Sequence, residues 1–209
     1  MPEVLALVAF AYLLGSIPCG WVVMKLYRNL DVRKLGSGNI GAANVFRTGG
    51  PGAFVFTVIL DALKGFIPVM LAIALGLGNQ EWALALIGLA AVIGHTWPIY
   101  LRFRGGKGVA TSGGVLLALA PVAIILAALS WALIVRLTRL ASLSSLAAVA
   151  VGFISLIALH LVGWTLWRPV GWSVVVLGVA LAGMIFYRHR HNIERLASGR
   201  ELKLTPTDG

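Results

Sequence analysis

The stretch 109–135, VATSGGVLLALAPVAIILAALSWALIV, decides between two folds for this chain. It has no charged residue and is longer than the ~20 residues that a helix needs to cross a bilayer core. Pro121 lies near its middle, and proline ends or kinks a helix just before itself. A single long helix here gives six membrane spans in all, whereas two short helices that turn at Pro121 give seven.

The composition of the whole chain is that of a membrane protein. Of 209 residues, 59% are hydrophobic and only 11% are charged, against ~25% charged in soluble domains. Apolar runs of roughly 20 residues recur, and none alternates with the period of two that β-barrel strands show. We expect an all-α integral membrane protein forming a single domain over 1–209, with 203–209 as a loose tail.

Basic residues lie mainly in the loops between the apolar runs. A net charge of +10 would suggest nucleic acid as a partner of a soluble protein, but membrane topology explains these positions better, so no nucleic-acid partner is expected. The single cysteine, Cys19, excludes an intramolecular disulfide. Because the first residues lack the basic start of a signal peptide, Cys19 is interpreted as a buried small residue and not as a lipidation site.

The positive-inside rule decides the number of spans. Six spans would place Arg136, Arg139 and the basic segment that starts at Arg188 outside the cell. A hairpin at Pro121 returns all of them to the cytoplasm, provided that its two short helices are packed within protein. We therefore predict seven helices, the fourth and fifth short, with the N-terminus outside and the C-terminus cytoplasmic. The expected spans are 4–27, 53–77, 82–101, 108–120, 121–135, 143–166 and 169–187.

Three polar islands, 36–47, 95–111 and 188–201, fall on the cytoplasmic side of this topology. The first contains a literal G-x-G-x-x-G at Gly36, with Asp61 downstream. A dinucleotide site needs a strand before the first glycine. Here a membrane helix precedes it, and Asp61 lies within an apolar run. The island is instead predicted to be a glycine-rich loop of hydrogen-bond donors, or else a plain solvated connector.

The second island resembles a phosphate-binding P-loop only superficially. That motif requires Ser or Thr directly after the lysine and a glycine five residues before the Gly-Lys pair, but Gly108 and Leu101 stand in those places. Glycine N–H groups, the charge of Lys107 and a helix starting just after it still favour an anion. His95, near the end of the third helix, fits a packing role as well as a proton carrier.

In the third island His189 and Asn192 are three residues apart, hence on one face of a helix. A basic helix that contacts anionic lipid headgroups would explain the arginines around them, but it does not require this histidine and asparagine. Asp61 and Lys64 have the same spacing within a span. Charged groups there are costly, and mutual pairing is the simplest account, with a direct role as the alternative.

The residues alone therefore indicate a membrane protein that handles a phosphorylated, lipidic ligand from its inner face. No H-E-x-x-H motif, cysteine–histidine cluster or carboxylate pair supports a metal site, so no metal or other cofactor is expected.

Three segments together carry a specific resemblance. GSGNIGAANVFR (36–47), GHTWPIYLRFRGGKGVAT (94–111) and HRHNIERLASGRE (189–201) resemble, in order and spacing, the signature segments of the bacterial acyl-phosphate:glycerol-3-phosphate acyltransferases. Ala43 stands where that family commonly has threonine, and Ala197 where it has leucine. The resemblance implies a seven-helix enzyme of the bacterial inner membrane with its active site facing the cytoplasm.

The same resemblance implies the reaction. A fatty acyl group passes from acyl phosphate to the sn-1 hydroxyl of glycerol 3-phosphate, giving lysophosphatidic acid and inorganic phosphate in the first acylation of phospholipid synthesis. The expected partners are therefore these two substrates and membrane lipids. A transporter or a lipid-binding scaffold is the competing class, although its usual internal repeat and midplane polar groups are not visible here.

By resemblance, the catalytic residues that surround glycerol 3-phosphate are expected to be Ser37, Arg47, Lys107, His189 and Asn192. The expected phosphate-binding residues are Gly38, Asn39, Asn44, His95, Gly105, Gly106, Gly108 and Thr111. The base stays open between His189 and a substrate phosphate oxygen. Ser37 as an acyl nucleophile is less favoured, because no base lies beside it in the sequence.

Overall fold

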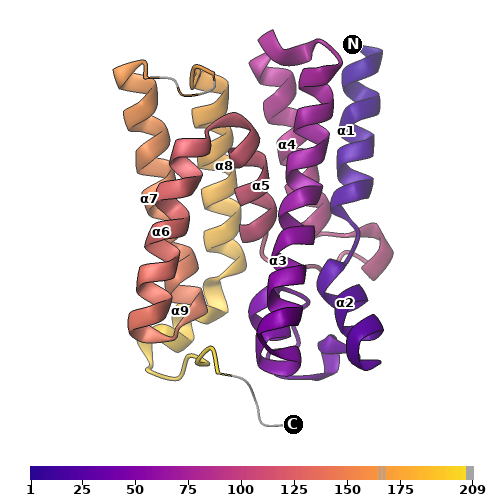
Figure 1. Ribbon diagram of the computed structural model, residues 1–209, viewed down its shortest axis with the longest axis vertical. Helices are drawn as coiled ribbons and strands as arrows, with labels where there is room; N and C mark the ends of the chain where they lie inside the picture. Colours follow the sequence, from indigo (N-terminus) through magenta and orange to yellow (C-terminus); the bar gives the residue numbers. More distant parts are fainter. Residues whose placement is uncertain (165, 167, 206–209) are drawn as a thin grey trace.

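The computed structural model describes residues 1–164, 166 and 168–205, and within them every regular element is a helix. Within these described residues, five helical segments are long and apolar enough to cross a membrane, and a sixth candidate is the pair α8 and α9, bent by 58° at its break. In Figure 1 the long helices lie side by side along the long axis, with the start of α1 and the helix α9 at opposite ends of the molecule. The predicted all-α membrane class is confirmed.

The helices follow the predicted spans with shifted ends. They are α1 (Pro2–Gly15), α2 (Cys19–Arg28), η1 (Val32–Lys34), α3 (Ala42–Ala74), η2 (Leu77–Asn79), α4 (Glu81–Thr96), η3 (Ile99–Leu101), α5 (Val109–Leu119), α6 (Pro121–Thr138), α7 (Ala141–Val162), α8 (Trp172–Arg188) and α9 (Arg190–Ala197).

The predicted break at Pro121 is confirmed. Ala120, between α5 and α6, has the non-helical angles φ −148° and ψ 69°, and Pro121 starts α6, where its missing N–H costs no hydrogen bond. The chain reverses direction there (Figure 1). The expectation of a short fifth helix is wrong: α6 has 18 residues and is by itself a candidate span. It continues until Arg139 adopts a left-handed conformation, with Arg136 in its last turn, where a cation is favourable.

The first predicted span is two helices. Its break falls at Ser16–Pro18, because Pro18 precedes α2 with φ −85° and ψ 74°. The freed carbonyl of Ile17 accepts hydrogen bonds from the Cys19 N–H at 3.0 Å and from Lys64 Nζ of α3 at 2.9 Å. Cys19 is buried, as expected.

The second predicted span begins earlier than expected. α3 starts at Ala42, so the last residues of the first polar island, including Asn44 and Arg47, are helical and not part of a loop. Gly50, with φ 83° and ψ −175°, interrupts the helix before its apolar part. Such a positive φ is readily adopted only by glycine. The kink separates a short polar helical segment from the span.

Two glycines bring α3 and α5 into backbone contact. A Cβ atom at Gly65 would lie 2.2 Å from the carbonyl oxygen of Thr111, and one at Gly114 would lie 1.9 Å from that of Ala62. Gly65 and Gly114 thus allow the two helices to pack closely. Among the described residues, Gly183 on α8 has no neighbour within 4 Å of such an atom, so it serves no comparable contact. The close α3–α5 contact fixes two walls of the cavity described next.

Candidate functional site

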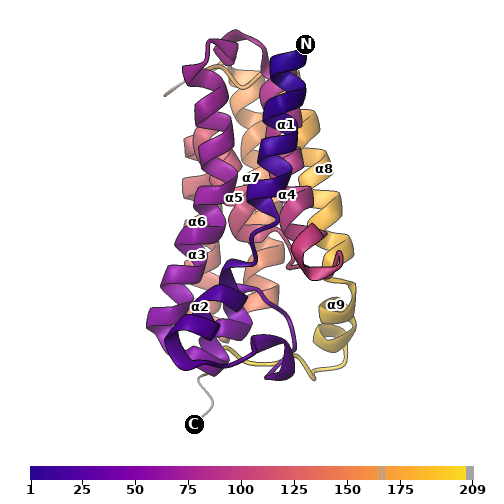
Figure 2. The ribbon, with the colours of Figure 1, turned by 90° about the vertical axis from the view of Figure 1, so that its right-hand side faces the viewer.

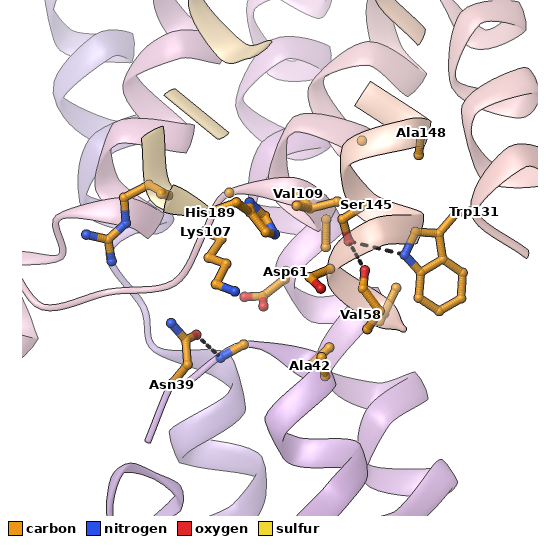
Figure 3. Close-up of a pocket in the computed structure, with 18 of the residues that line it drawn as sticks. Asn39, Ala42, Val58, Asp61, Lys107, Val109, Trp131, Ser145, Ala148 and His189 are labelled. Atoms are coloured by element: carbon orange, nitrogen blue, oxygen red, sulfur yellow. Dashed lines mark hydrogen bonds between the residues drawn. The ribbon is translucent and has the colours of Figure 1, made fainter. Parts of the chain in front are cut away.

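The three polar islands meet at one cavity of about 660 Å³. Its lining comes from the segments before α3 and α5, from the helices α3 to α7, and from the end of α8, α9 and the residues that follow it. Figure 2 shows α2 and α9 at the same end of the molecule, and Figure 3 shows Lys107, Asp61 and His189 drawn together around the cavity, with Trp131 on its far side.

A chain of hydrogen bonds forms the polar wall. Lys107 Nζ donates to Asn192 Oδ1 at 2.5 Å, and Asn192 Nδ2 donates to Glu201 Oε1 at 2.6 Å. Arg195 Nε donates to the other oxygen, Glu201 Oε2, at 2.8 Å. Lysine and arginine only donate and carboxylate only accepts, so this order fixes the Asn192 amide with its oxygen toward Lys107.

The electrostatics of this wall follow from burial among cations. Burial lowers the pKa of Lys107 to about 8, with Glu201 acting against the shift and Arg195, Arg47 and Arg188 adding to it. Burial alone would raise the pKa of Glu201, but hydrogen bonds from Asn192 and Arg195 outweigh it and hold that pKa below its usual range. The wall thus presents excess positive charge, which suits a phosphate.

His189 lies beyond the end of α8 and is 2% exposed. Its Nδ1 lies 2.8 Å from the carbonyl oxygen of Ile185. Because a carbonyl only accepts, Nδ1 carries the proton and Nε2 has a free lone pair. Burial, and then the charge of Lys107, lower the pKa of His189 to about 4, so the ring is neutral near pH 7.

Arg47 connects the first island to the C-terminal segment. Its Nε donates to the carbonyl of Lys203 and its guanidinium NH2 group to that of Leu202, both at 3.0 Å. The Leu204 N–H donates to the carbonyl of Arg139 at 2.6 Å. Part of the tail expected to be loose is therefore held against the cavity, while 206–209 lie outside the described residues.

Asn44 holds the first island in shape. Its Oδ1 accepts the Ser37 N–H at 2.8 Å, and its Nδ2 donates to the carbonyls of Val32, Leu35 and Asn39 at 2.9–3.0 Å. This side chain, expected to bind phosphate, thus uses its amide within the loop that presents Ser37. Ser37 itself is exposed and lines the cavity.

The backbone groups of Gly105 and Gly106 in the second island bond to other parts of the protein, although these glycines were expected to bind phosphate. The N–H groups of Gly105 and Gly106 donate to the carbonyls of Thr96 and His95 at 3.2 and 3.1 Å, so they are already used. Their own carbonyls accept hydrogen bonds from Arg188. Gly108, with φ 85°, caps α5, and it lines the cavity together with Val109 and Ala110 of the first turn of that helix.

The opposite wall is apolar and carries two stacked aromatic rings. Phe54 of α3 and Trp131 of α6 lie 6.1 Å apart at 18° between ring planes, and Trp131 Nε1 donates to Ser145 of α7 at 3.3 Å. Small residues such as Gly113 and Ala148 line the space between the helices. One cavity thus joins a cationic wall to a hydrocarbon-lined one.

This pairing of walls agrees with the comparisons with known proteins. A sequence model described as glycerol-3-phosphate acyltransferase matches residues 5–199. The chain belongs to the glycerol-3-phosphate acyltransferase family. It is 47% identical over 212 residues to the enzyme of Rubrobacter xylanophilus, covering 100% of this chain and 98% of that one. It is 43% identical over 202 residues to that of Anaeromyxobacter sp. (strain Fw109-5), covering 96% of each.

Solved structures of this acyltransferase family have the same fold. The chain resembles crystal structures of PlsY (YgiH), an integral membrane glycerol 3-phosphate acyltransferase, in its glycerol 3-phosphate form (TM-score 0.86) and in its lysophosphatidic acid form (TM-score 0.84). Identity is 41%, and the match covers 96% of this chain and 95% of the other in both cases. The chain is thus an acyltransferase that acts on glycerol 3-phosphate in phospholipid synthesis.

The acyltransferase cavity gathers most of the predicted site residues. All five expected catalytic residues line it, as do Asn39, Asn44, His95 and Gly108, whereas Gly38, Gly105, Gly106 and Thr111 do not. Arg188, Arg195 and Glu201 also line it but were not predicted; their place within the third island was the available signal. In the part of the chain that the structure describes, no group of three or more metal-ligating side chains occurs.

Proposed function

We propose that this acyltransferase takes its acyl group from acyl phosphate and transfers it to the sn-1 hydroxyl of glycerol 3-phosphate. The products are lysophosphatidic acid and inorganic phosphate. The observation that carries the proposal is the continuity of one cavity from the cationic wall at Lys107 to the apolar wall at Trp131. Both substrates bring a phosphate to the first wall, and the fatty chain of the donor needs the second.

In the reaction, the hydroxyl oxygen of glycerol 3-phosphate attacks the carbonyl carbon of the mixed anhydride, and the bond from that carbon to the phosphate oxygen breaks. The anhydride is already activated, so no covalent enzyme intermediate is required. Arg47, Lys107 and Asn192 hold the phosphate of glycerol 3-phosphate, with Ser37 at the edge of the loop. Positioning and charge stabilisation then supply most of the rate acceleration.

The hydroxyl proton goes to a phosphate oxygen of the substrates in this proposal. A base works best with a pKa near the operating pH, and burial lowers the pKa of His189 to about 4. A phosphate monoester, with a second pKa of ~6, is the better acceptor. The free Nε2 of His189 instead accepts a hydrogen bond from the neighbouring sn-2 hydroxyl. This contact orients glycerol 3-phosphate toward the donor carbonyl and leaves the sn-1 proton to the phosphate oxygen.

The proposed topology has seven spans in a single domain, with α1 and α2 together as the first and α5 as a short fourth. The first and third islands and the turn between α6 and α7 lie at the end of the molecule opposite to the N-terminus (Figure 1), while the second island, which joins α4 to α5, lies nearer the middle. By the positive-inside rule, that end faces the cytoplasm and the N-terminus lies outside. We place the enzyme in the bacterial inner membrane, where the acyl chain enters from the bilayer and glycerol 3-phosphate from the cytoplasm.

The test is phosphate release by the purified protein in detergent or lipidic mesophase. We expect inorganic phosphate to appear from acyl phosphate only when glycerol 3-phosphate is present, in equal amount to lysophosphatidic acid. An acyl thioester serves as the control donor. Equal turnover with that thioester would contradict acyl phosphate as the specific donor, and binding or movement of substrate without product would favour a transporter.

A further inference from the structure

A cluster of buried ionisable side chains lies beside the cavity, and the proposed mechanism does not use it. Asp61, Lys64 and His95 are 2%, 4% and 4% exposed. Lys64 Nζ lies 2.8 Å from Asp61 Oδ1, so the predicted pairing of these two residues is confirmed. His95 Nδ1 faces the same oxygen at 3.5 Å, which makes the contact an electrostatic one and not a tight hydrogen bond. Ionisable side chains within a membrane cost free energy, so their presence there indicates a structural or functional role.

One side of the cluster is anchored at the break between α1 and α2. Lys64 Nζ donates to the carbonyl oxygen of Ile17 at 2.9 Å, so its ammonium is held between that carbonyl and Asp61. If Lys64 and Asp61 were only a structural pair, they would need no histidine and no access to the cavity. Asp61 and His95 nevertheless both line the cavity.

The other side of the cluster reaches the second island. The His95 carbonyl accepts the N–H of Gly106 at 3.1 Å. A Cβ atom at Gly106 would lie only 2.1 Å from His95 Nε2, so the imidazole edge packs directly on the Gly106 backbone. The position of this ring therefore sets where residue 106 lies. The next residue is Lys107, whose ammonium donates to Asn192.

We propose that Asp61, through His95, is a positioning residue for Lys107: the carboxylate holds the imidazole ring against Gly106, and the ring fixes the backbone from which the Lys107 ammonium reaches the substrate phosphate. This proposal rests on the proposed function, in which Lys107 binds that phosphate. It extends the role of Asp61 from pairing with Lys64 to setting the geometry of the site.

The primary variant is the double substitution Asp61→Asn with Lys64→Gln. It removes both charges together, because a single change would leave one buried charge unpaired at a high cost in stability. The second variant, His95→Gln, keeps the Asp61–Lys64 pair and removes only the ring. The matched control is Thr57→Val on the same helix, a buried residue whose hydroxyl donates to the carbonyl of Ala53 one turn earlier in α3.

Each variant is measured with Lys107 present and with Lys107→Ala. With Lys107 present, we expect the double variant and His95→Gln to lower kcat/KM for glycerol 3-phosphate by about 10- to 100-fold, as misplacement of a reacting group does. In the Lys107→Ala background, we expect the same substitutions to lower kcat/KM by less than about threefold. The effects of residues that act through one another are not additive. Full additivity, or unchanged kcat/KM in both variants, would overturn the proposal.

Hydrogen–deuterium exchange of the segment 104–108 gives a readout that does not depend on activity. The Gly105 and Gly106 amides are hydrogen-bonded to the end of α4. We expect them to exchange faster in both variants and at the wild-type rate in Thr57→Val. Unchanged protection would contradict the positioning role even if the enzyme proved inactive on acyl phosphate, whereas altered protection with no acyl-phosphate activity would contradict only the proposed function.

Discussion

At the scale of single residues, the proposed role of Lys107 in binding phosphate predicts that the enzyme loses activity at alkaline pH. Burial lowers the pKa of its ammonium to about 8, and only the protonated form attracts a phosphate. The charge is present below that pKa and is lost as the pH rises through it. We expect kcat/KM for glycerol 3-phosphate to be level between the second phosphate pKa of ~6 and pH ~8, and to fall by about tenfold per pH unit above pH ~8, since kcat/KM reports the free enzyme and the free substrate. Phosphate release without glycerol 3-phosphate is subtracted at each pH.

The substitution Lys107→Arg tests whether Lys107 causes this fall of kcat/KM at alkaline pH, the alkaline limb of the profile. Arginine stays protonated throughout the accessible range, so the limb should move to higher pH even where the altered geometry lowers the maximum rate. Lys25→Arg, an exposed lysine on α2, should leave the profile unchanged. If the fall in kcat/KM still begins near pH ~8 in Lys107→Arg, a group other than Lys107 causes it.

His189→Gln separates the two candidate bases. Glutamine keeps a hydrogen-bonding group of similar reach but cannot take up a proton. With a substrate phosphate as the base, we expect kcat to fall by about 10- to 100-fold while the shape of the pH–rate profile is retained. Loss of the acidic limb of that profile would instead identify His189 as the base.

At the scale of elements, the contact between α3 and α5 holds two cavity walls together. A Cβ atom at Gly114 would lie 1.9 Å from the carbonyl oxygen of Ala62, and neither backbone can yield without moving its helix. We expect Gly114→Ala to destabilise the protein by about 1–3 kcal/mol and to lower activity. Thermal unfolding in detergent measures the effect. The same substitution at Gly183, which has open space, should leave the melting temperature within about a degree or raise it slightly, because alanine is the better helix former. Equal losses at both positions would contradict the packing argument.

At the scale of the whole molecule, the topology predicts which surface residues face each side of the membrane. In a Cys19→Ala background, single cysteines replace the exposed residues Lys34, Asn79 and Arg139. We expect a membrane-impermeant thiol reagent to label positions 34 and 139 only from the cytoplasmic side, and position 79 only from outside. Labelling of position 139 from outside together with cytoplasmic labelling of position 34 would overturn the seven-span arrangement.

Much of the fold follows from local sequence. Apolar runs set the helices, Pro121 set the break between α5 and α6, and basic residues in the loops indicated one common side for the islands. The errors lie at helix ends. The sequence alone did not show that α3 begins at Ala42 before the kink at Gly50, or that Pro18 separates α1 from α2, because such ends depend on which neighbours accept the freed backbone groups.

By itself, the sequence determined the membrane class, the break at Pro121 and, through three long segments, the family, and it predicted that the islands bind phosphate. Only the tertiary structure decided which polar groups remain available for substrate. It committed Asn44 to its own loop, the N–H groups of Gly105 and Gly106 to the end of α4, and Glu201 to the support of Asn192. The physical reason is that buried polar groups form hydrogen bonds with partners from distant segments of the chain, and a local sequence pattern does not identify those partners.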